Sequence, residues 1–281
     1  MADCGGAFSF VDRITEIEPR RHARGQFTVP ERLNALSPCL VAEAVGQLAA
    51  WVAMSHVQFR SRPVAALARE TRIRTDVAPG KTVDLEIEME DCTTAAIAYR
   101  GWARVDGFTV MELNECVGPM LPMVDFDDPA AMRERFETLC GPGVSCRVAV
   151  DPVVVDPYIV TERDPGRRLR AAIQIPESAP FFADHFPRQP VFPATLLLEA
   201  QIRLAAALAA EVVDPSLRPW LRPTCVRDVK VRTFLRPGQR VEIATELLSA
   251  KGTTVEIALA AMADGKRAST ARAEIGQWEP P

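Results

Sequence analysis

Two stretches of the chain are apolar on nearly every side, and each is followed by segments in which apolar and polar residues alternate. The first stretch, after Ser37 and Pro38, reads LVAEAVGQLAAWVAM, and the second, after Pro193, reads ATLLLEAQIRLAAALAA. Stretches of this length predict helices, and the absence of a polar face predicts that both helices are buried. Ser37 suits the N-cap position and Pro38 the first helical position, so we expect the first helix to begin there.

Alternation with a period of two follows both helices. The segments VDLEIEME and AIAYRGWARV follow the first helix, and VEIATELL and VEIALAAM follow the second. This period is typical of antiparallel strands, and the pairs Pro79 with Gly80 and Asp106 with Gly107 are turn signals. The predicted fold class is therefore α+β, with an antiparallel sheet wrapped around one long central helix in each half.

The two halves are copies of one unit. Moving the chain by 146 residues places 15–31 on 161–177 with seven identities in seventeen positions, where average residue usage gives about one. Further matches follow in the same order at shifts of 156 and 158. Because the shift between matching residues increases from 146 to 156, copy one lacks about ten residues that copy two has within 181–192. One opening strand is predicted in each copy, at 14–29 and 160–175.

These observations divide the chain into two tandem repeats. The first is expected at 1–118 and the second at 148–281. Between them, residues 119–147 are rich in Pro, Gly and acidic residues and indicate a connection. Part of it, 129–139, predicts a short surface helix.

Composition excludes several classes of protein. The chain is 48% hydrophobic and 25% charged, so it can build a hydrophobic core without disulfide bonds or structural metals. Its net charge of −4 gives no sign of the basic surface that binds nucleic acid. Its seven cysteines form no C-x-x-C pair, which predicts free thiols and a cytoplasmic location. The longest uncharged run, 44–59, is too short to span a membrane.

Arginines gather in three places. They are Arg20, Arg21 and Arg24; Arg60 and Arg62; and Arg167, Arg168 and Arg170. The first interpretation is that they lie on solvated faces and loop ends, and the alternative is a local patch for an acidic partner such as an acyl carrier protein or a phosphate.

His185 is the candidate general base among the three histidines. It lies in FFADHFPRQPVFPATLLLEA, a run of aromatic residues and prolines directly before a buried helix. Apolar surroundings and a nearby helix N-terminus favour the neutral imidazole, which can accept a proton near pH 7. The alternative is a buried histidine satisfied by the backbone. His22 is expected to face solvent, and His56 to lie past the first helix in a capping or surface role.

Glu43 and Glu199 occupy equivalent positions inside the two apolar helices. Burial raises the pKa of a carboxyl group, and a carboxyl that is neutral at pH 7 can donate a proton. The alternative is a carboxylate that reaches solvent or an arginine. Arg203, one turn after Glu199, is expected to form an ion pair with it, whereas Glu43 has Gln47 at that position.

The run DHFPRQPVFPATLLLEA resembles the signature of (3R)-hydroxyacyl-acyl-carrier-protein dehydratases, GHFPxxPVMPGVLxxEA, and EAVGQLAA resembles the family's EAMAQAA. His185 and Glu199 are fourteen residues apart, the spacing that the family keeps between its histidine and its helix carboxylate. The chain departs from the signature at Asp184, where the family has glycine, at Ala194, where a glycine opens the helix, and at Arg188, a small-residue position.

The resemblance implies a fused double-hotdog fold in which the two units pair about a pseudo-twofold axis. Each active site of the family takes its histidine from one unit and its acid from the other. Because copy one lacks the histidine loop, the resemblance implies one working site per chain, built from His185 and Glu43. It further implies a set of residues around this pair. The Ala194 amide would hold the thioester carbonyl with Pro193 and Gln47 as positioning residues, and Phe186, Val191 and Phe192 would line an apolar tunnel between the helices.

The implied activity is elimination of water from 3-hydroxyacyl thioesters. The acyl group would be carried on a phosphopantetheine arm, of an acyl carrier protein or of coenzyme A, with no metal and no dissociable cofactor. Fatty acid, polyketide and other lipid pathways stay open, as does further homo-oligomerisation of the intrachain pseudo-dimer. Two alternatives also stay open, a hotdog acyl thioesterase and a non-catalytic partner that binds acyl carriers.

Overall fold

The computed structural model describes residues 6–33, 36–141 and 158–278. Copy one contributes β1 (Arg13–Glu18), β2 (His22–Thr28), α1 (Pro38–His56), β3 (Ser61–Pro63), β4 (Leu67–Ile73), β5 (Thr82–Cys92), β6 (Ala96–Val105) and β7 (Phe108–Pro122). The segment between the copies contributes η1 (Met123–Asp125) and α2 (Pro129–Cys140). Copy two contributes β8 (Ile159–Asp164), β9 (Arg168–Gln174), η2 (Pro180–Ala183), α3 (Ala194–Val212), η3 (Pro215–Trp220), β10 (Arg222–Val231), β11 (Arg240–Lys251), β12 (Thr254–Ala263) and β13 (Lys266–Gly276).

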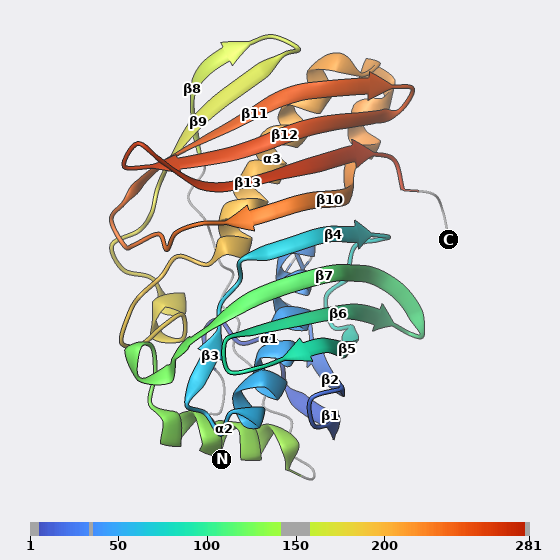
Figure 1. Ribbon diagram of the computed structural model, residues 1–281. Helices are drawn as coiled ribbons and strands as arrows, with labels where there is room; N and C mark the ends of the chain where they lie inside the picture. Colours follow the sequence, from blue (N-terminus) through green and yellow to red (C-terminus); the bar gives the residue numbers. More distant parts are fainter. Residues whose placement is uncertain (1–5, 34–35, 142–157, 279–281) are drawn as a thin grey trace.

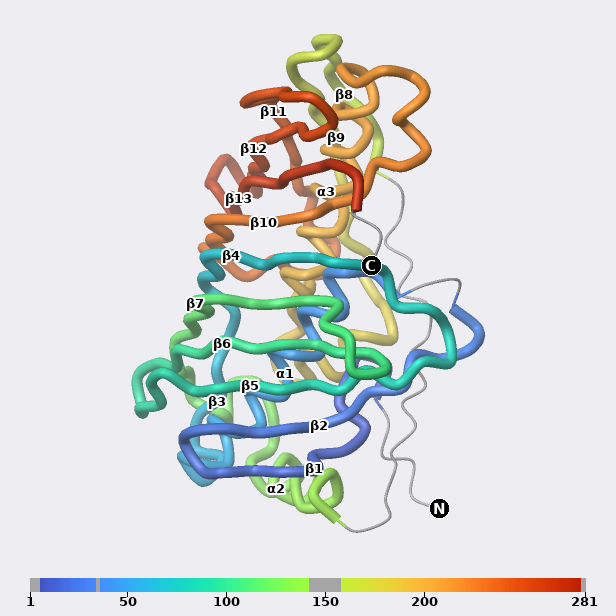
Figure 2. The backbone as a smooth tube through the Cα atoms, turned by 90° about the vertical axis from the view of Figure 1, so that its right-hand side faces the viewer, coloured from blue at the N-terminus to red at the C-terminus, as the bar shows by residue number. Residues whose placement is uncertain are grey.

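Both copies join in one antiparallel sheet. Its order is β1-β2-β5-β6-β7-β4-β10-β13-β12-β11-β9-β8, with β3 paired to β7 outside this path. The order of equivalent strands reverses at β4 and β10, which pair through Cys225 with Arg72 and Val229 with Ala68. The sheet therefore has a pseudo-twofold axis between these two strands, and the predicted α+β double hotdog is confirmed (Figures 1 and 2).

The two long helices lie side by side behind this sheet (Figure 1). Helix α1 begins as predicted, because the Ser37 hydroxyl accepts a hydrogen bond from the Cys39 N–H and Pro38 is the first helical residue. By length and composition α1 could cross a membrane. Most of its side chains are instead buried against β5, β6 and α3, as expected for the core helix of a hotdog unit.

Each predicted opening strand is in fact a two-stranded hairpin. The chain turns after Glu18, where Arg20 has φ 66° and the Arg21 N–H donates to the Glu18 carbonyl. The same turn in copy two contains Pro165 and Gly166, whose φ is 68°. Proline followed by a residue with positive φ is the pattern of a type II turn. The hairpins place an edge strand at each end of the sheet; β8 is mostly exposed, whereas β1 is partly covered and Ile14 is buried.

The connection between the copies is more ordered than its composition indicates. Strand β7 continues to Pro122, four residues past the predicted end of the first repeat at 118. Helix α2 is present where 129–139 predicts one, and Asp128 caps it by accepting from the Ala130 and Ala131 N–H groups. Met132 and Leu139 are buried, so one face of this helix packs on copy one.

Candidate active site

The loop that only copy two has holds His185 in one orientation. The His185 N–H donates to the Phe181 carbonyl at 2.9 Å, and the Val191 N–H donates to the His185 carbonyl at 2.9 Å. The ring Nδ1 lies 2.9 Å from the Val191 carbonyl oxygen. Since a carbonyl can only accept, Nδ1 carries the proton, and the lone pair belongs to Nε2.

Apolar rings surround this imidazole. Phe186 stacks on it with centroids 4.1 Å apart, and Phe8 meets it edge-on at 5.5 Å. Burial lowers the pKa of His185 to about 4; the hydrogen bond to Val191 opposes this shift, and the charge of Arg62 adds to it. The imidazole is therefore neutral at pH 7, the form that a proton acceptor requires.

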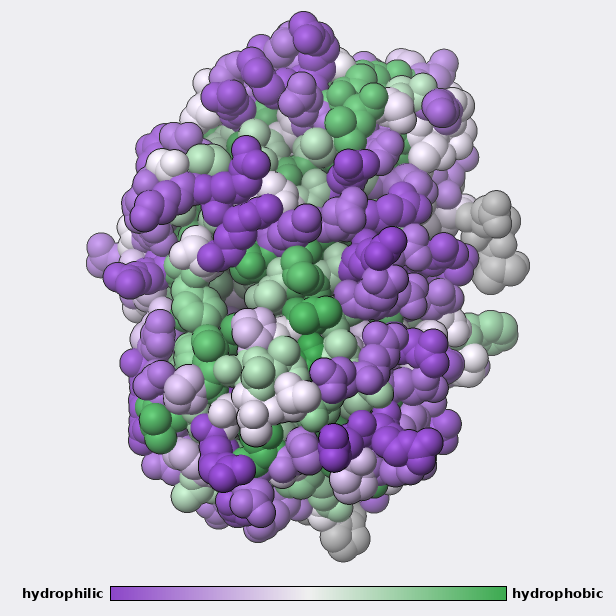
Figure 3. Space-filling view, in the orientation of Figure 1, coloured by the Kyte–Doolittle hydropathy of each residue, from purple (hydrophilic) through white to green (hydrophobic). Residues whose placement is uncertain are grey.

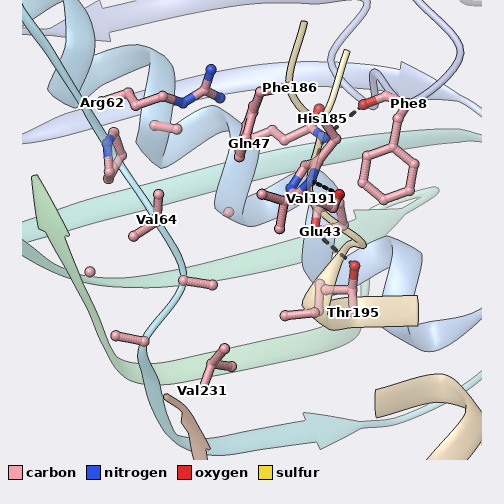
Figure 4. A pocket seen from close by; sticks show the side chains of 18 of the residues that line it. Phe8, Glu43, Gln47, Arg62, Val64, His185, Phe186, Val191, Thr195 and Val231 are labelled. Carbon is pink, nitrogen blue, oxygen red and sulfur yellow. Dashed lines mark hydrogen bonds between the residues drawn. The ribbon is translucent and has the colours of Figure 1, made fainter. Parts of the chain in front are cut away.

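Glu43 comes to the same place from α1 of copy one. Its Oε1 accepts from Gln47 Nε2 at 3.0 Å, and its Oε2 accepts from Thr195 Oγ1 of copy two at 2.9 Å. Burial raises the pKa of the Glu43 carboxyl, against the lowering effect of both hydrogen bonds and of Arg62. A carboxyl group in this state can donate a proton near neutral pH. Figure 4 shows Glu43 and His185 facing the same cavity from the two copies.

Hydrogen bonds hold the segment before β1 next to His185. Gln47 holds it at two points, since its Nε2 donates to the Phe8 carbonyl at 3.0 Å and its Oε1 accepts from the Phe10 N–H at 2.8 Å. The Phe8 N–H donates to Asp184 Oδ2 at 2.7 Å. Asp184, which stands where the resembled signature has glycine, therefore ties the His185 loop to the N-terminal segment.

Arg188, the second departure in this loop, also has a structural partner. Its N–H donates to the Phe126 carbonyl and its Nη1 to the Val124 carbonyl, each at 3.0 Å. Its Nη2 forms an ion pair with Asp128 at 3.3 Å. The loop is thus anchored to the connection between the copies.

The N-terminus of α3 forms one wall of the site. Ala194 is its first residue and lines the cavity, whereas Pro193 occupies the N-cap position and is not among the lining residues. The first N–H groups of a helix have no partner within the helix, and the helix dipole is positive there. The Ala194 N–H is therefore suited to hold a carbonyl oxygen that gains negative charge.

One cavity of about 410 Å³ connects these groups. Helix α1 lines it with Ala42, Gly46 and Ala50, which are small residues and leave space, and α3 lines it with Leu197 and Leu198. The three predicted tunnel residues, Phe186, Val191 and Phe192, all lie in its wall. Residues around the start of β4 and the end of β10 also line it, and Figure 3 shows apolar residues gathered on this middle part of the sheet face.

The symmetry-related position, around Glu199, is not a second copy of the site. Glu199 has a hydrogen bond with the Ser37 hydroxyl, but Pro38, which has no N–H, stands where copy two has Ala194. Ile202 replaces the small Gly46, and its side chain is buried. This position therefore lacks the histidine loop, the amide donor and the space.

Three expectations about polar residues are wrong. Among the described residues no ion pair joins Glu199 to Arg203, and burial raises the pKa of Glu199 although Arg203 lowers it. His22 is mostly covered, and its Nε2 lies 3.0 Å from Glu86 Oε1 on the sheet. Arg62, read from sequence as part of a solvated cluster, is only 12% exposed and lines the cavity.

Comparisons with known proteins agree with this architecture. A sequence model of the ApeI-like family, described as ApeI dehydratase, matches residues 161–271. The 3-hydroxyacyl-[acyl-carrier-protein] dehydratase FabZ of Anaeromyxobacter sp. (strain Fw109-5) is 31% identical over 41% of this chain and 77% of its own. FabZ of Myxococcus xanthus (strain DK1622) is 36% identical over 38% of this chain and 71% of its own.

Solved structures resemble the fold over most of the chain. A putative oleoyl thioesterase from Lactobacillus plantarum has a TM-score of 0.60 at 9% identity and covers 92% of this chain and 97% of its own. A tesB protein from Mycobacterium avium subs paratuberculosis has a TM-score of 0.55 at 14% identity and covers 95% and 96%. At these identities the likeness concerns the fold, whereas the sequence relatives carry the assignment: the chain belongs to the family of hotdog 3-hydroxyacyl-acyl-carrier-protein dehydratases.

Proposed function

We propose that the chain removes water from 3-hydroxyacyl thioesters to give trans-2-enoyl thioesters, and adds it in the reverse direction. One observation carries the proposal. A neutral imidazole from copy two and a carboxyl of raised pKa from copy one line the same cavity, beside the N-terminus of α3. Elimination of water needs a base for the C2 proton and an acid for the leaving hydroxyl group.

The thioester carbonyl accepts from the Ala194 N–H, which stabilises the negative charge that develops when the C2 proton leaves. His185 Nε2 takes that proton. Glu43 gives its proton to the C3 hydroxyl, the C3–O bond breaks, and water leaves as the C2–C3 double bond forms. His185 then carries the former C2 proton, and Glu43 is ionised because its proton has left with the water; proton exchange with solvent restores both groups.

Side chains and one backbone amide supply all of these steps, so the proposal includes no metal and no dissociable cofactor. The relatives' names point to substrates on acyl carrier protein, and coenzyme A offers the same phosphopantetheine arm. The proposed setting is lipid metabolism in the cytoplasm.

The test is incubation of the protein with trans-2-enoyl thioesters of several chain lengths. Loss of the conjugated enoyl absorbance without release of thiol is the expected result, because hydration leaves the thioester intact. Release of free thiol from saturated acyl thioesters would instead identify a thioesterase. Binding of acyl carriers with neither reaction would identify a non-catalytic partner.

A further inference from the structure

Arg62 is a buried cation beside the proposed catalytic pair that the elimination reaction does not use. It lies on β3 with its side chain 12% exposed and lines the cavity with His185 and Glu43. Its guanidinium carbon is 3.8 Å from the centroid of the Phe186 ring, the same ring that stacks on His185. Figure 4 shows the guanidinium group directed toward Phe186, on the side of the cavity where His185 lies.

Much of the hydrogen-bonding capacity of Arg62 is unused. Among the described residues, Nε and Nη1 are enclosed and have no hydrogen-bond partner. The carboxylate that forms an ion pair with Arg62 is Asp127, whose Oδ2 lies 3.7 Å from Nη1, beyond hydrogen-bond length. Buried donors in folded proteins are nearly always paired, and a guanidinium has five of them.

Neighbouring charged residues do not supply the missing hydrogen-bond acceptors of Arg62. Both oxygens of Glu43 already accept hydrogen bonds, from Gln47 and Thr195. Arg135, the other guanidinium among the described lining residues, also has an enclosed Nε without a partner, but it is hydrogen-bonded to the Ser9 hydroxyl and lies 3.9 Å from Asp184. Arg62 is therefore the cation in this wall that is placed to receive an acceptor from a ligand.

The simplest substrate of the proposed reaction has no further hydrogen-bond acceptor that Arg62 could bind. Its thioester carbonyl is assigned to the Ala194 N–H and its 3-hydroxyl to Glu43. A guanidinium matches a carboxylate in charge and geometry better than it matches a neutral oxygen. We infer, on the basis of the proposed dehydration, that the natural acyl chain carries a third oxygen-bearing group, a carboxylate, and that Arg62 binds it as a specificity-determining residue.

The experiment measures binding with acyl pantetheine analogues in which nitrogen replaces the thioester sulfur. They lack the 3-hydroxyl and the thioester, so they can be neither dehydrated nor cleaved as thioesters. Three pairs differ only at the chain end, methyl against carboxylate: valeryl with glutaryl, hexanoyl with adipyl, and octanoyl with suberyl. Titration calorimetry on the wild-type chain should give, for at least one pair, tighter binding of the carboxylate member by about 10- to 100-fold.

Variants test the residue. Arg62→Met keeps much of the apolar stem over Phe186 and should bring that ratio to within about 3-fold of one. Arg62→Lys should retain part of the preference through its charge. Arg60→Met, which removes an exposed arginine two residues away and outside the cavity wall, is the matched control and should keep the wild-type ratio.

Three results would overturn the inference. They are equal affinity of the wild-type chain for both members of every pair, absence of binding by all carboxylate members, and equal weakening of both members by Arg62→Met. The last result would place the role of Arg62 in packing or in pantetheine binding. Enoyl hydration is measured separately, so failure of the proposed reaction leaves this binding result readable.

Discussion

The carboxyl group of Glu43 accepts a hydrogen bond of 2.9 Å from the hydroxyl of Thr195, a residue 152 positions further along the chain. Glu43 belongs to the core helix of copy one, and Thr195 belongs to the first turn of α3 in copy two. The bond therefore fixes the proposed acid against the helix end whose first amide is proposed to bind the substrate carbonyl. Acid and oxyanion donor are positioned by the same contact between the copies.

Replacing Thr195 by valine should shift the alkaline side of the pH profile upward. The hydroxyl lowers the pKa of Glu43 by donating to its charged form, so its loss lets the pKa rise further and Glu43 stays protonated to higher pH. The measurement is kcat/KM for enoyl hydration against pH. Thr233→Val is the control, since Thr233 lines the cavity without a bond to Glu43. An unchanged alkaline limb in Thr195→Val would show that the contact does not act on the acid.

The His185→Ala variant should lose about 10²- to 10⁴-fold in turnover, the usual contribution of a positioned general base. His185 lies in a loop outside the core helices, so circular dichroism and the melting temperature should show a folded chain. Wild-type turnover in this variant would exclude the assigned role.

The two helix glutamates should differ, although they occupy equivalent positions in the copies. Glu43→Gln removes the proton donor beside His185 and should abolish most activity. Glu199→Gln changes a carboxyl whose surroundings lack the histidine loop and the amide donor, so its turnover should stay within about 3-fold of wild type. Both variants are measured under the same conditions. If Glu199→Gln is the inactive one, the pairing of His185 across the copies is wrong.

Activity should extend to unusually acidic pH for a histidine-dependent reaction. The base is competent only when neutral, and the pKa of His185 is lowered to about 4, so activity should fall as pH drops through about 4. The acid is competent only when protonated, and the pKa of Glu43 is raised, so activity should fall again above that raised pKa. The profile of kcat/KM is recorded with recovery at pH 7 as a check on unfolding. An acid limb near the ordinary imidazole value of 6.5 would contradict the buried base.

Restoring glycine at position 184 should loosen the N-terminal segment. Asp184→Gly removes the acceptor of the Phe8 N–H, which should lower the free energy of unfolding by about 1–2 kcal/mol. Asp184→Asn keeps an acceptor oxygen and should lose less. Urea titration of both variants provides the comparison, and equal stability of Asp184→Gly and wild type would mean that the segment is held by its other contacts.

The sequence predicts correctly those elements that occur in both copies or that have a local sequence signature. Two buried helices, their alternating strands and the α+β class follow from periodicity, and the Ser37 cap follows from local chemistry. The two hairpins were missed because the turn at Arg20 uses positive φ without a glycine, and its neighbours on both sides read as one strand. The equivalent Pro165 with Gly166 in copy two was the signal that could have revealed both.

The residues missed at the site all act through distant contacts. Thr195, Phe8 and Arg62 approach His185 or Glu43 only because the pseudo-twofold and the sheet bring separate segments together. Nothing in the spacing around Arg62 indicates burial, since its neighbours in sequence are also polar or proline. Such roles depend on tertiary packing, and a short window of sequence does not contain them.

The pairing of β4 with β10 makes each copy depend on the other for a covered sheet edge. If the second repeat existed alone, β10 would be an open edge and α3 would lack its neighbouring helix. In the whole chain this surface is covered by the equivalent surface of copy one, because β10 pairs with β4. Within one chain the two copies need not be alike, so the His185 loop of one copy and the Glu43 helix of the other are enough to build one candidate site.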